Sequence, residues 1–488
     1  ESFLRKNKLM PTNIYKGENH AAEFFIGLNR NLFNNPNMWS KIAIFNQEND
    51  DNTEDLAKFF KLIRSNKYYS DPTINGYIDV EYFSRFDAFL TITKNFHHDY
   101  FHNMRLILDP WKGKVTQLIV DPIISSEELN SNEKIFELDF SSNDLATHLN
   151  KNTKYIHEKY KWIHYYLTQK NIIAGVKLHA EKIKKNLSIV QKKEPYFIKA
   201  PNHNQDIEKI ILMLEKNKKN FLELLNSNPK SSWNKNFENF DISVNDFTPL
   251  YDLKIKFYNG KAPEWLGIDL NYDNTISENE PKFFVDQNLN EVKLPIVIYS
   301  NRFKKNNFSS TIFHSYEINL ANTYFKFITS NKSLPSSIES KNFFNKKTFL
   351  IEEKKNDYAV KSNISNSIIF LESNKSKNKI ILNGNINVNE NLIFNDEVEL
   401  EPGTNFFIKP NKHIIFKKKV TANGTKEKPI IFKRFNNQKK PWGSLVVLGK
   451  NTKGSFFNNV IVDGGSGGKF NQYKFTSMFS IHGVKNFT

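Results

Sequence analysis

The chain has 488 residues, of which 39% are hydrophobic and 14% aromatic, so it can build folded cores, and its length predicts about three domains. The formal net charge of +17 is compatible with a polyanion-binding face, but the basic residues are scattered rather than gathered in one block. The absence of cysteine excludes disulfides, thiolate metal sites and a cysteine nucleophile.

No apolar run approaches the roughly 20 residues that cross a bilayer, so we expect no membrane span. The chain opens at Glu1 rather than Met, and we expect it to be part of a longer protein. The scattered lysines are typical of a solvated Lys/Asn-rich surface, and we do not expect nucleic acid as a partner. A surface polysaccharide or another polyanion stays open as a partner.

The first elements are a short strand and two helices. Thr12–Lys16 predicts a strand that ends in a lysine, with Gly17 as the turn. Asn52–Arg64 has apolar residues at helical spacing after a Thr53 cap. Asp79 can cap a second helix, which leads into a polar loop.

Residues 95–122 predict a β-hairpin. Met104–Leu108 and Val115–Val120 are apolar and branched enough to be strands. Asp109–Gly113 between them has turn residues, with a pre-set φ at Pro110. The chain should therefore return to the end at which the first strand began.

This hairpin should bring three oxygen-bearing side chains together. Asn103 precedes the first strand and Asp121 follows the second, so we expect them about 5 Å apart. Asp99 lies on the loop that enters the same end. Two carboxylates and a carboxamide favour a hard cation.

A histidine cluster on the same loop offers a different interpretation. His97, His98 and His102 surround Asp99 and suggest a transition-metal site. Adjacent histidines on a loop point apart, and no His-Glu-x-x-His motif follows, so capping or packing roles for these histidines stay open.

The order of the acidic and amide residues is similar to that of protein kinases, in which a catalytic-loop Asp and Asn precede a hairpin and a metal-binding Asp. Here the order is Asp99-x-x-x-Asn103, hairpin, Asp121, with one residue fewer between Asp and Asn. His98 before Asp99 corresponds to part of the His-Arg-Asp triplet.

Read together, residues 1–190 resemble the atypical spore-coat-protein-H (CotH) kinase family. The resemblance is carried by these segments: Glu1 with its Phe-Leu run, Asn13–Gly17, Phe83–Ala88, Asn95–Asp99, Asn103, Met104–Leu108 and Asp121. It implies a minimal protein-kinase-like fold that transfers the γ-phosphate of ATP, with Mg²⁺ or Mn²⁺, to Ser/Thr of secreted or surface proteins.

Carried over residue by residue, the resemblance makes Asp99 the catalytic base, and Asn103 and Asp121 the metal ligands. Lys16 would bind phosphate, and Glu23 would be its ion-pair partner. Two departures bear on activity: Val120 stands where the family usually has Trp, and Ile123 where it has a second acid.

The middle of the chain changes from helical to β patterns. Asn143–Asn226 reads as packing helices, and Asn226–Val244 as a linker. Short turn-bounded strands then predict a small β-rich domain that continues to about Leu350.

From about Ser362, beginning with Ile368–Leu371, short β runs follow one another with Asn and Gly between them, which suits a parallel β-helix. Three segments resemble the turns of right-handed β-helix proteins of the pectate-lyase type: Val420–Thr425, Lys428–Phe432 and Pro441–Leu445. The run ends without a cap, so we expect further coils beyond Thr488.

The predicted fold is multidomain α+β and β: a partial kinase-like α+β domain (1–240), a β-rich intermediate domain (241–355) and an incomplete right-handed β-helix (356–488). The leading hypothesis is a secreted or surface-associated bacterial protein that joins an ATP-dependent protein kinase domain to a β-helix. Two alternatives stay open: a catalytically degenerate binding protein whose β-helix mediates interaction, and a polysaccharide-processing enzyme working from the β-helix.

Overall fold

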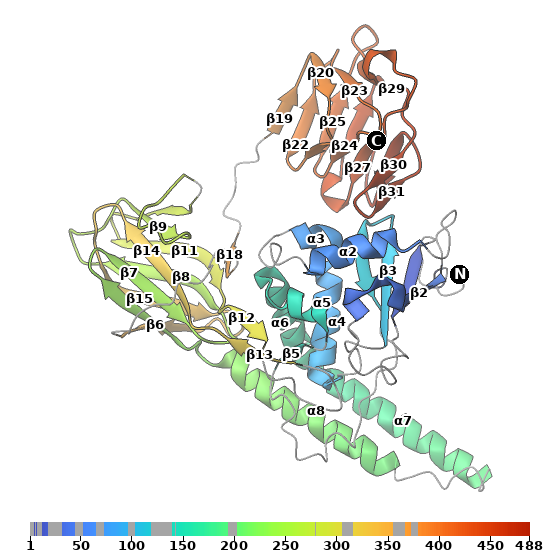
Figure 1. The fold of residues 1–488 in the computed structure, drawn as a ribbon. Helices are drawn as coiled ribbons and strands as arrows, with labels where there is room; N and C mark the ends of the chain where they lie inside the picture. The colour runs from blue at the N-terminus through green and yellow to red at the C-terminus, as the bar shows by residue number, and fades with distance from the viewer. Residues whose placement is uncertain are drawn as a thin grey trace.

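The computed structural model describes residues 4, 6, 12–17, 32–43, 52–64, 73–95, 103–118, 139–141, 143–193, 203–278, 280–304, 316–354, 367–371 and 379–488. These residues form a multidomain, β-rich α/β structure (Figure 1). A mixed α/β part comes first, a pair of sheets second, and a stack of short parallel strands third.

The first part contains a four-stranded antiparallel sheet in the order β2-β1-β3-β4. Its strands are β1 (Asn13–Gly17), β2 (Trp39–Ala43), β3 (Met104–Asp109) and β4 (Lys114–Gln117). Tyr15, Leu106, Leu108 and Val115 are buried in the core that this sheet shares with the helices. The predicted strands at Thr12–Lys16 and Met104–Leu108, and the hairpin, are confirmed.

The helices around this sheet begin where the sequence predicts. α2 (Glu54–Arg64) follows Thr53, although the Asn52 side chain, rather than that of Thr53, accepts from a helical N–H, at 3.0 Å from Glu54 N. α3 (Thr73–Tyr77) precedes α4 (Val80–Thr93). Asp79 caps α4, because its Oδ1 accepts from Tyr82 N at 3.0 Å.

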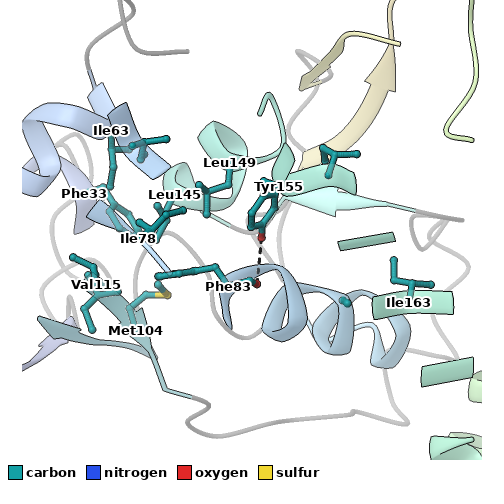
Figure 2. Close-up of a cluster of buried hydrophobic side chains, with 14 of the residues drawn as sticks. Phe33, Ile63, Ile78, Phe83, Met104, Val115, Leu145, Leu149, Tyr155 and Ile163 are labelled. Carbon is teal, nitrogen blue, oxygen red and sulfur yellow. Dashed lines mark hydrogen bonds between the residues drawn. The ribbon is translucent and has the colours of Figure 1, made fainter. Parts of the chain in front are cut away.

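α4 packs against α6 (Thr153–Leu167), which follows the short α5 (Asp144–Leu149). Figure 2 shows this contact, with the Tyr155 hydroxyl donating to the Phe83 carbonyl oxygen at 3.4 Å. α7 (Ile172–Lys193) and α8 (His203–Asn226) form an antiparallel pair that projects from the rest of the first part (Figure 1). None of the helices described here is long and apolar enough to cross a membrane.

The second part is a pair of sheets with one shared core. The first has the order β10-β9-β14-β7-β6-β17, and the second β16-β15-β8-β11-β18. The strands are β6 (Ser231–Asn236), β7 (Asn239–Val244), β8 (Leu250–Phe257), β9 (Trp265–Asp269), β10 (Lys282–Phe284), β11 (Glu291–Ile298), β14 (Thr323–Thr329), β15 (Pro335–Asn342), β16 (Thr348–Leu350), β17 (Glu352–Glu353) and β18 (Ile368–Phe370).

The interpretation of Asn226–Val244 as a linker is wrong over most of its length. Residues 231–244 form the β6–β7 hairpin, so this sheet begins before the predicted boundary at 241. Trp233, Phe240 and Ile242 are buried in the core of the two sheets, and Asn234 and Asp241, which pair with each other, lie on the opposite face of the hairpin. Because side chains alternate between the two faces of a strand, such a segment looks polar in sequence although Trp233, Phe240, Ile242 and Val244 share its buried face.

A small sheet connects the first two parts. It contains β12 (Arg302–Lys304), β13 (Tyr316–Leu320) and β5 (Phe140–Ser141), in the order β12-β13-β5. The Arg302 guanidinium lies 5.0 Å from the ring centre of Tyr160 on α6. His157, also on α6, shares a hydrogen bond of 3.2 Å with the Tyr299 hydroxyl.

The third part, which we call the coil domain (residues 379–488), consists mainly of three parallel sheets. Their orders are β19-β22-β25-β28, β20-β23-β26-β29 and β21-β24-β27-β32, and a separate hairpin pairs β30 with β31. The strands are β19 (Lys379–Leu382), β20 (Asn385–Val388), β21 (Leu392–Phe394), β22 (Glu397–Leu400), β23 (Asn405–Ile408), β24 (Ile414–Phe416), β25 (Val420–Asn423), β26 (Ile430–Arg434), β27 (Leu445–Leu448), β28 (Phe456–Asn458), β29 (Val460–Val462), β30 (Gly468–Phe470), β31 (Tyr473–Phe475) and β32 (Phe479–His482).

In successive coils, side chains of the same type stack on each other. The rings of Phe406 and Phe432 are 4.6 Å apart and nearly parallel, and those of Phe394 and Phe416 are 5.1 Å apart. One predicted member of the run lies elsewhere: Ile368–Phe370 pairs with β11 of the second part. Its short apolar sequence is compatible with pairing either to a strand of the coil domain or to β11, and in the structure it pairs with the edge of β11.

Candidate functional site

Two of the predicted site residues lie at one end of the β1–β3 pair. Lys16 is opposite Arg105, and Gly17, the last residue of β1, is opposite Met104, the first residue of β3. Asn103 immediately precedes Met104 and has a left-handed backbone with φ of 61°. Both Lys16 and Asn103 are half-buried. An ammonium group and a carboxamide therefore belong to the same end of this sheet.

The elements on either side lead the chain toward the same end. α4 ends at Thr93, and Lys94 adopts a left-handed conformation with φ of 50° that closes the helix. Asn95 is fully buried at the start of the connection. The Lys94 ammonium lies 5.6 Å from the ring centre of Phe221 on α8, which holds this helix end against the helical core.

The hairpin turn at the opposite end of β3 has a defined geometry. Asp109 Oδ1 accepts from the backbone N–H groups of Trp111 and Lys112, at 2.9 and 3.1 Å. Gly113 has φ of 61°, which a residue with a side chain rarely adopts. β4 then returns antiparallel to β3, and Leu118 N donates to Arg105 O at 2.9 Å. The chain leaves β4 beside the residues with which β3 began.

Asp99, Glu23 and Asp121 lie outside the described residues, as do His97, His98, His102 and Ile123. Within the described ranges, no group of three or more His, Asp and Glu side chains could hold a metal ion. The described part of the site thus consists of Lys16 and Asn103. Asn103 carries an amide oxygen, a donor that suits Mg²⁺.

A buried charge network, which the sequence analysis missed, lies beside this region. Lys159 on α6 is fully buried, and its Nζ lies 2.6 Å from Asp139 Oδ1 and 2.9 Å from Asp87 Oδ2 on α4. Tyr155 donates to Asp87 at 2.8 Å, and Tyr160 donates to Asp139 at 3.0 Å. The signal was present, because Lys159 is four residues from both Tyr155 and Ile163, on the apolar face of α6.

The protonation of this network follows from its burial and its charges. Burial raises the pKa of Asp87, against the lowering effect of Lys159. Burial also opposes ionisation of Asp139, but the charge and hydrogen bond of Lys159 prevail and lower its pKa. Burial would lower the pKa of Lys159, yet the two carboxylates raise it. The network joins α4, α6 and Asp139.

The second feature that the sequence did not reveal is a contact between the hairpin turn and the coil domain. His482 Nδ1 donates to the Trp111 carbonyl oxygen at 2.9 Å, and Lys474 N donates to Pro110 O, also at 2.9 Å. Figure 1 shows the coil domain next to the strand end that carries this turn. The contact lies at the end of β3 remote from Asn103, about 20 Å away along a six-residue strand.

The sequence matches no protein-family model and no curated protein.

Proposed function

We propose that the first part of the chain transfers the γ-phosphate of ATP to Ser/Thr hydroxyls of proteins, as an atypical kinase. The observation that carries the proposal is the juxtaposition of Lys16 and Asn103 at the end of the sheet to which the β3–β4 hairpin returns. Phosphoryl transfer needs a cation on the phosphates and oxygen ligands for a metal close to it.

Each proposed residue has a role set by its chemistry. Lys16 would neutralise charge on the phosphates, with Glu23 orienting its ammonium. Asp99 would accept the proton of the attacking hydroxyl while that oxygen forms a bond to phosphorus and the bond to the ADP oxygen breaks. Asn103 and Asp121 would hold Mg²⁺ or Mn²⁺, which would neutralise charge on the β- and γ-phosphates.

We propose further that the coil domain is part of a right-handed parallel β-helix. What supports this is that every strand of its three main sheets pairs in parallel with a strand one coil earlier or later. Such a module suits binding or display in a secreted or surface-associated bacterial protein.

The experiment is transfer of label from γ-labelled ATP by the full chain, either to itself or to a generic protein acceptor, with Mg²⁺ or Mn²⁺. The variants are Asp99→Asn, Asp121→Ala and Lys16→Ala, and the control is Glu278→Ala, which removes an exposed acid in the second part. Each site variant should lower incorporation by at least about 100-fold, while the control retains it. Equal incorporation by the parent and Asp121→Ala would overturn the assignment.

A binding measurement separates catalysis from nucleotide recognition. ATP with Mg²⁺ at about 100 times its dissociation constant should stabilise the folded chain by about 2.7 kcal/mol. This appears as a rise in melting temperature, which Asp121→Ala should reduce. A parent chain that shows neither transfer nor a shift supports the degenerate binding protein instead.

A further inference from the structure

A cleft of about 650 Å³ separates the hairpin turn of the first part from the coil domain. One wall is formed by Trp111, Lys112 and Lys114 of the β3–β4 hairpin together with Lys154 at the start of α6. The coil domain supplies the other wall, including Lys417 and the loop around Asn471. The cleft is open to solvent and large enough for several linked rings.

Four lysines converge on this cleft from separate elements. Within the described lining there is no Asp or Glu, and none of Lys112, Lys154 and Lys417 has a carboxylate within ion-pair distance among the described residues. Lys114 Nζ donates to the Gly76 carbonyl oxygen at 3.0 Å. Two carboxylates lie nearby: Asp79 at the cap of α4, and Asp109, which accepts the N–H groups of the turn. The lining therefore has an excess of positive charge.

The electrostatics at Lys114 indicate how strongly the cleft disfavours a further cation. Burial lowers the pKa of Lys114 to about 8, Asp79 acts in the opposite sense, and the charges of Lys417 and Lys154 lower it further. Lys417 belongs to the coil domain and Lys154 to α6, so positive charges from two separate parts of the chain act on the Lys114 ammonium. A bound anion would relieve this repulsion.

The remaining lining suits a hydroxylated ligand better than a stacked base. Asn451 and Asn471 offer amides, and Asn471 Oδ1 already accepts from the Tyr77 hydroxyl at 3.3 Å. Trp111 has one face against His482, and Tyr473 stacks on Phe475 at 5.7 Å. Single-stranded nucleic acid uses open aromatic faces, whereas a sugar needs amides at its hydroxyls and cations at its acidic groups.

We propose that this cleft binds a segment of an acidic polysaccharide, with the anionic groups of successive sugars on Lys112, Lys154 and Lys417 and the hydroxyls on the asparagine amides. The site is independent of the proposed phosphoryl transfer, because it lies at the other end of the hairpin.

The test is calorimetric titration of the full chain at physiological salt with two acidic hexasaccharides, hexagalacturonate and a heparin-derived one. The cleft variant is the triple substitution Lys112→Gln/Lys154→Gln/Lys417→Gln. All three lysine side chains are exposed in the parent chain. The matched control, Lys182→Gln/Lys185→Gln/Lys216→Gln, removes the same charge from exposed positions on α7 and α8.

The cleft variant should bind at least one of the acidic hexasaccharides at least about tenfold more weakly than the parent, and the control less than about twofold. Unchanged melting temperatures in both variants show that folding is retained. Equal losses in the two variants would mean that only the net charge matters and would overturn the site.

Three further results would also overturn the proposal. One is failure of the parent to bind either hexasaccharide at millimolar concentration. Another is equal binding of the uncharged maltohexaose. The third is tighter binding of a hexathymidylate or of a hexaglutamate peptide, which would assign the cleft to nucleic acid or to an acidic protein segment.

Discussion

The indole ring of Trp111 stacks on the imidazole ring of His482, with ring centres 3.8 Å apart and planes inclined by 17°, although 371 positions separate the two residues. His482 Nδ1 also donates to the Trp111 carbonyl oxygen. Burial lowers the pKa of His482, and the hydrogen bond to Trp111 and the charge of Asp109 only partly offset this, so the stacked ring is favoured in its neutral form.

The stack predicts energetic coupling between the first part and the coil domain. Trp111→Ala and His482→Ala should each lower the free energy of unfolding. The double variant should lower it by about 0.5–1.5 kcal/mol less than the sum of the two single changes. The free energy of unfolding in urea, measured for the parent, the two single variants and the double variant, gives this coupling. Strictly additive effects would show that the rings do not stabilise each other.

Gly113→Ala should destabilise the same contact for two reasons. The residue has φ of 61°, and an added Cβ would overlap the Tyr473 ring. Gly260→Ala is the control, because Gly260 has φ of 68° and no atom within 4 Å of the added Cβ. The control should cost about 1 kcal/mol from backbone strain, and Gly113→Ala distinctly more.

Chemical unfolding measures both glycine variants. If the extra cost at Gly113 comes from the ring, it should shrink in a Tyr473→Ala background. Equal costs at Gly113 and Gly260 would contradict close contact between the turn and the coil domain.

Lys159→Met should destabilise the chain by about 3–5 kcal/mol, because it leaves Asp87 and Asp139 buried without their cation. Lys161→Met serves as a control. Its partner Glu158 is 3.0 Å away but solvent-accessible, so we expect a change of less than about 1 kcal/mol.

Adding Asp87→Asn and Asp139→Asn to Lys159→Met should recover part of the loss, since no buried charge is then unpaired. Urea unfolding measures each variant. A Lys159→Met chain as stable as the parent would show that the network does not hold α4 against α6.

Stability should fall as the pH drops from about 6.5 to 4. Burial lowers the pKa of His157 to about 4, with Lys161 acting in the same sense, Glu158 opposing and Lys346 lowering it further. Burial likewise lowers the pKa of His148 to about 4. Between these values the unfolded chain binds more protons than the folded one, so each histidine costs on the order of 3 kcal/mol by pH 4.

His157→Phe should flatten this pH dependence, although the loss of the hydrogen bond to Tyr299 costs about 1 kcal/mol at neutral pH. A matched His179→Gln variant, at an exposed position of α7, should keep the slope of the parent. The free energy of unfolding, measured at several pH values, gives both slopes. A His157→Phe slope equal to that of the parent would contradict burial of a neutral His157.

The sequence by itself determined the local elements of the first part. The turn residues Asp109–Gly113 and the apolar runs on either side are sufficient for the β3–β4 hairpin, and Asp79 is sufficient to begin α4, because turns and caps depend on residues close in the chain. The hairpin argument did not include the pairing of β1 with β3, which places Lys16 at the end of the sheet where Asn103 lies.

Only the tertiary structure decided what those elements contact. Residues 231–244 look like a linker until β14 pairs with β7, and Ile368–Phe370 belongs to the second part only because β11 is beside it. Lys159 looks like a surface lysine until Asp87 and Asp139 meet it. These contacts join residues far apart in the chain, and no short pattern specifies which distant partner a strand edge or a buried charge will find.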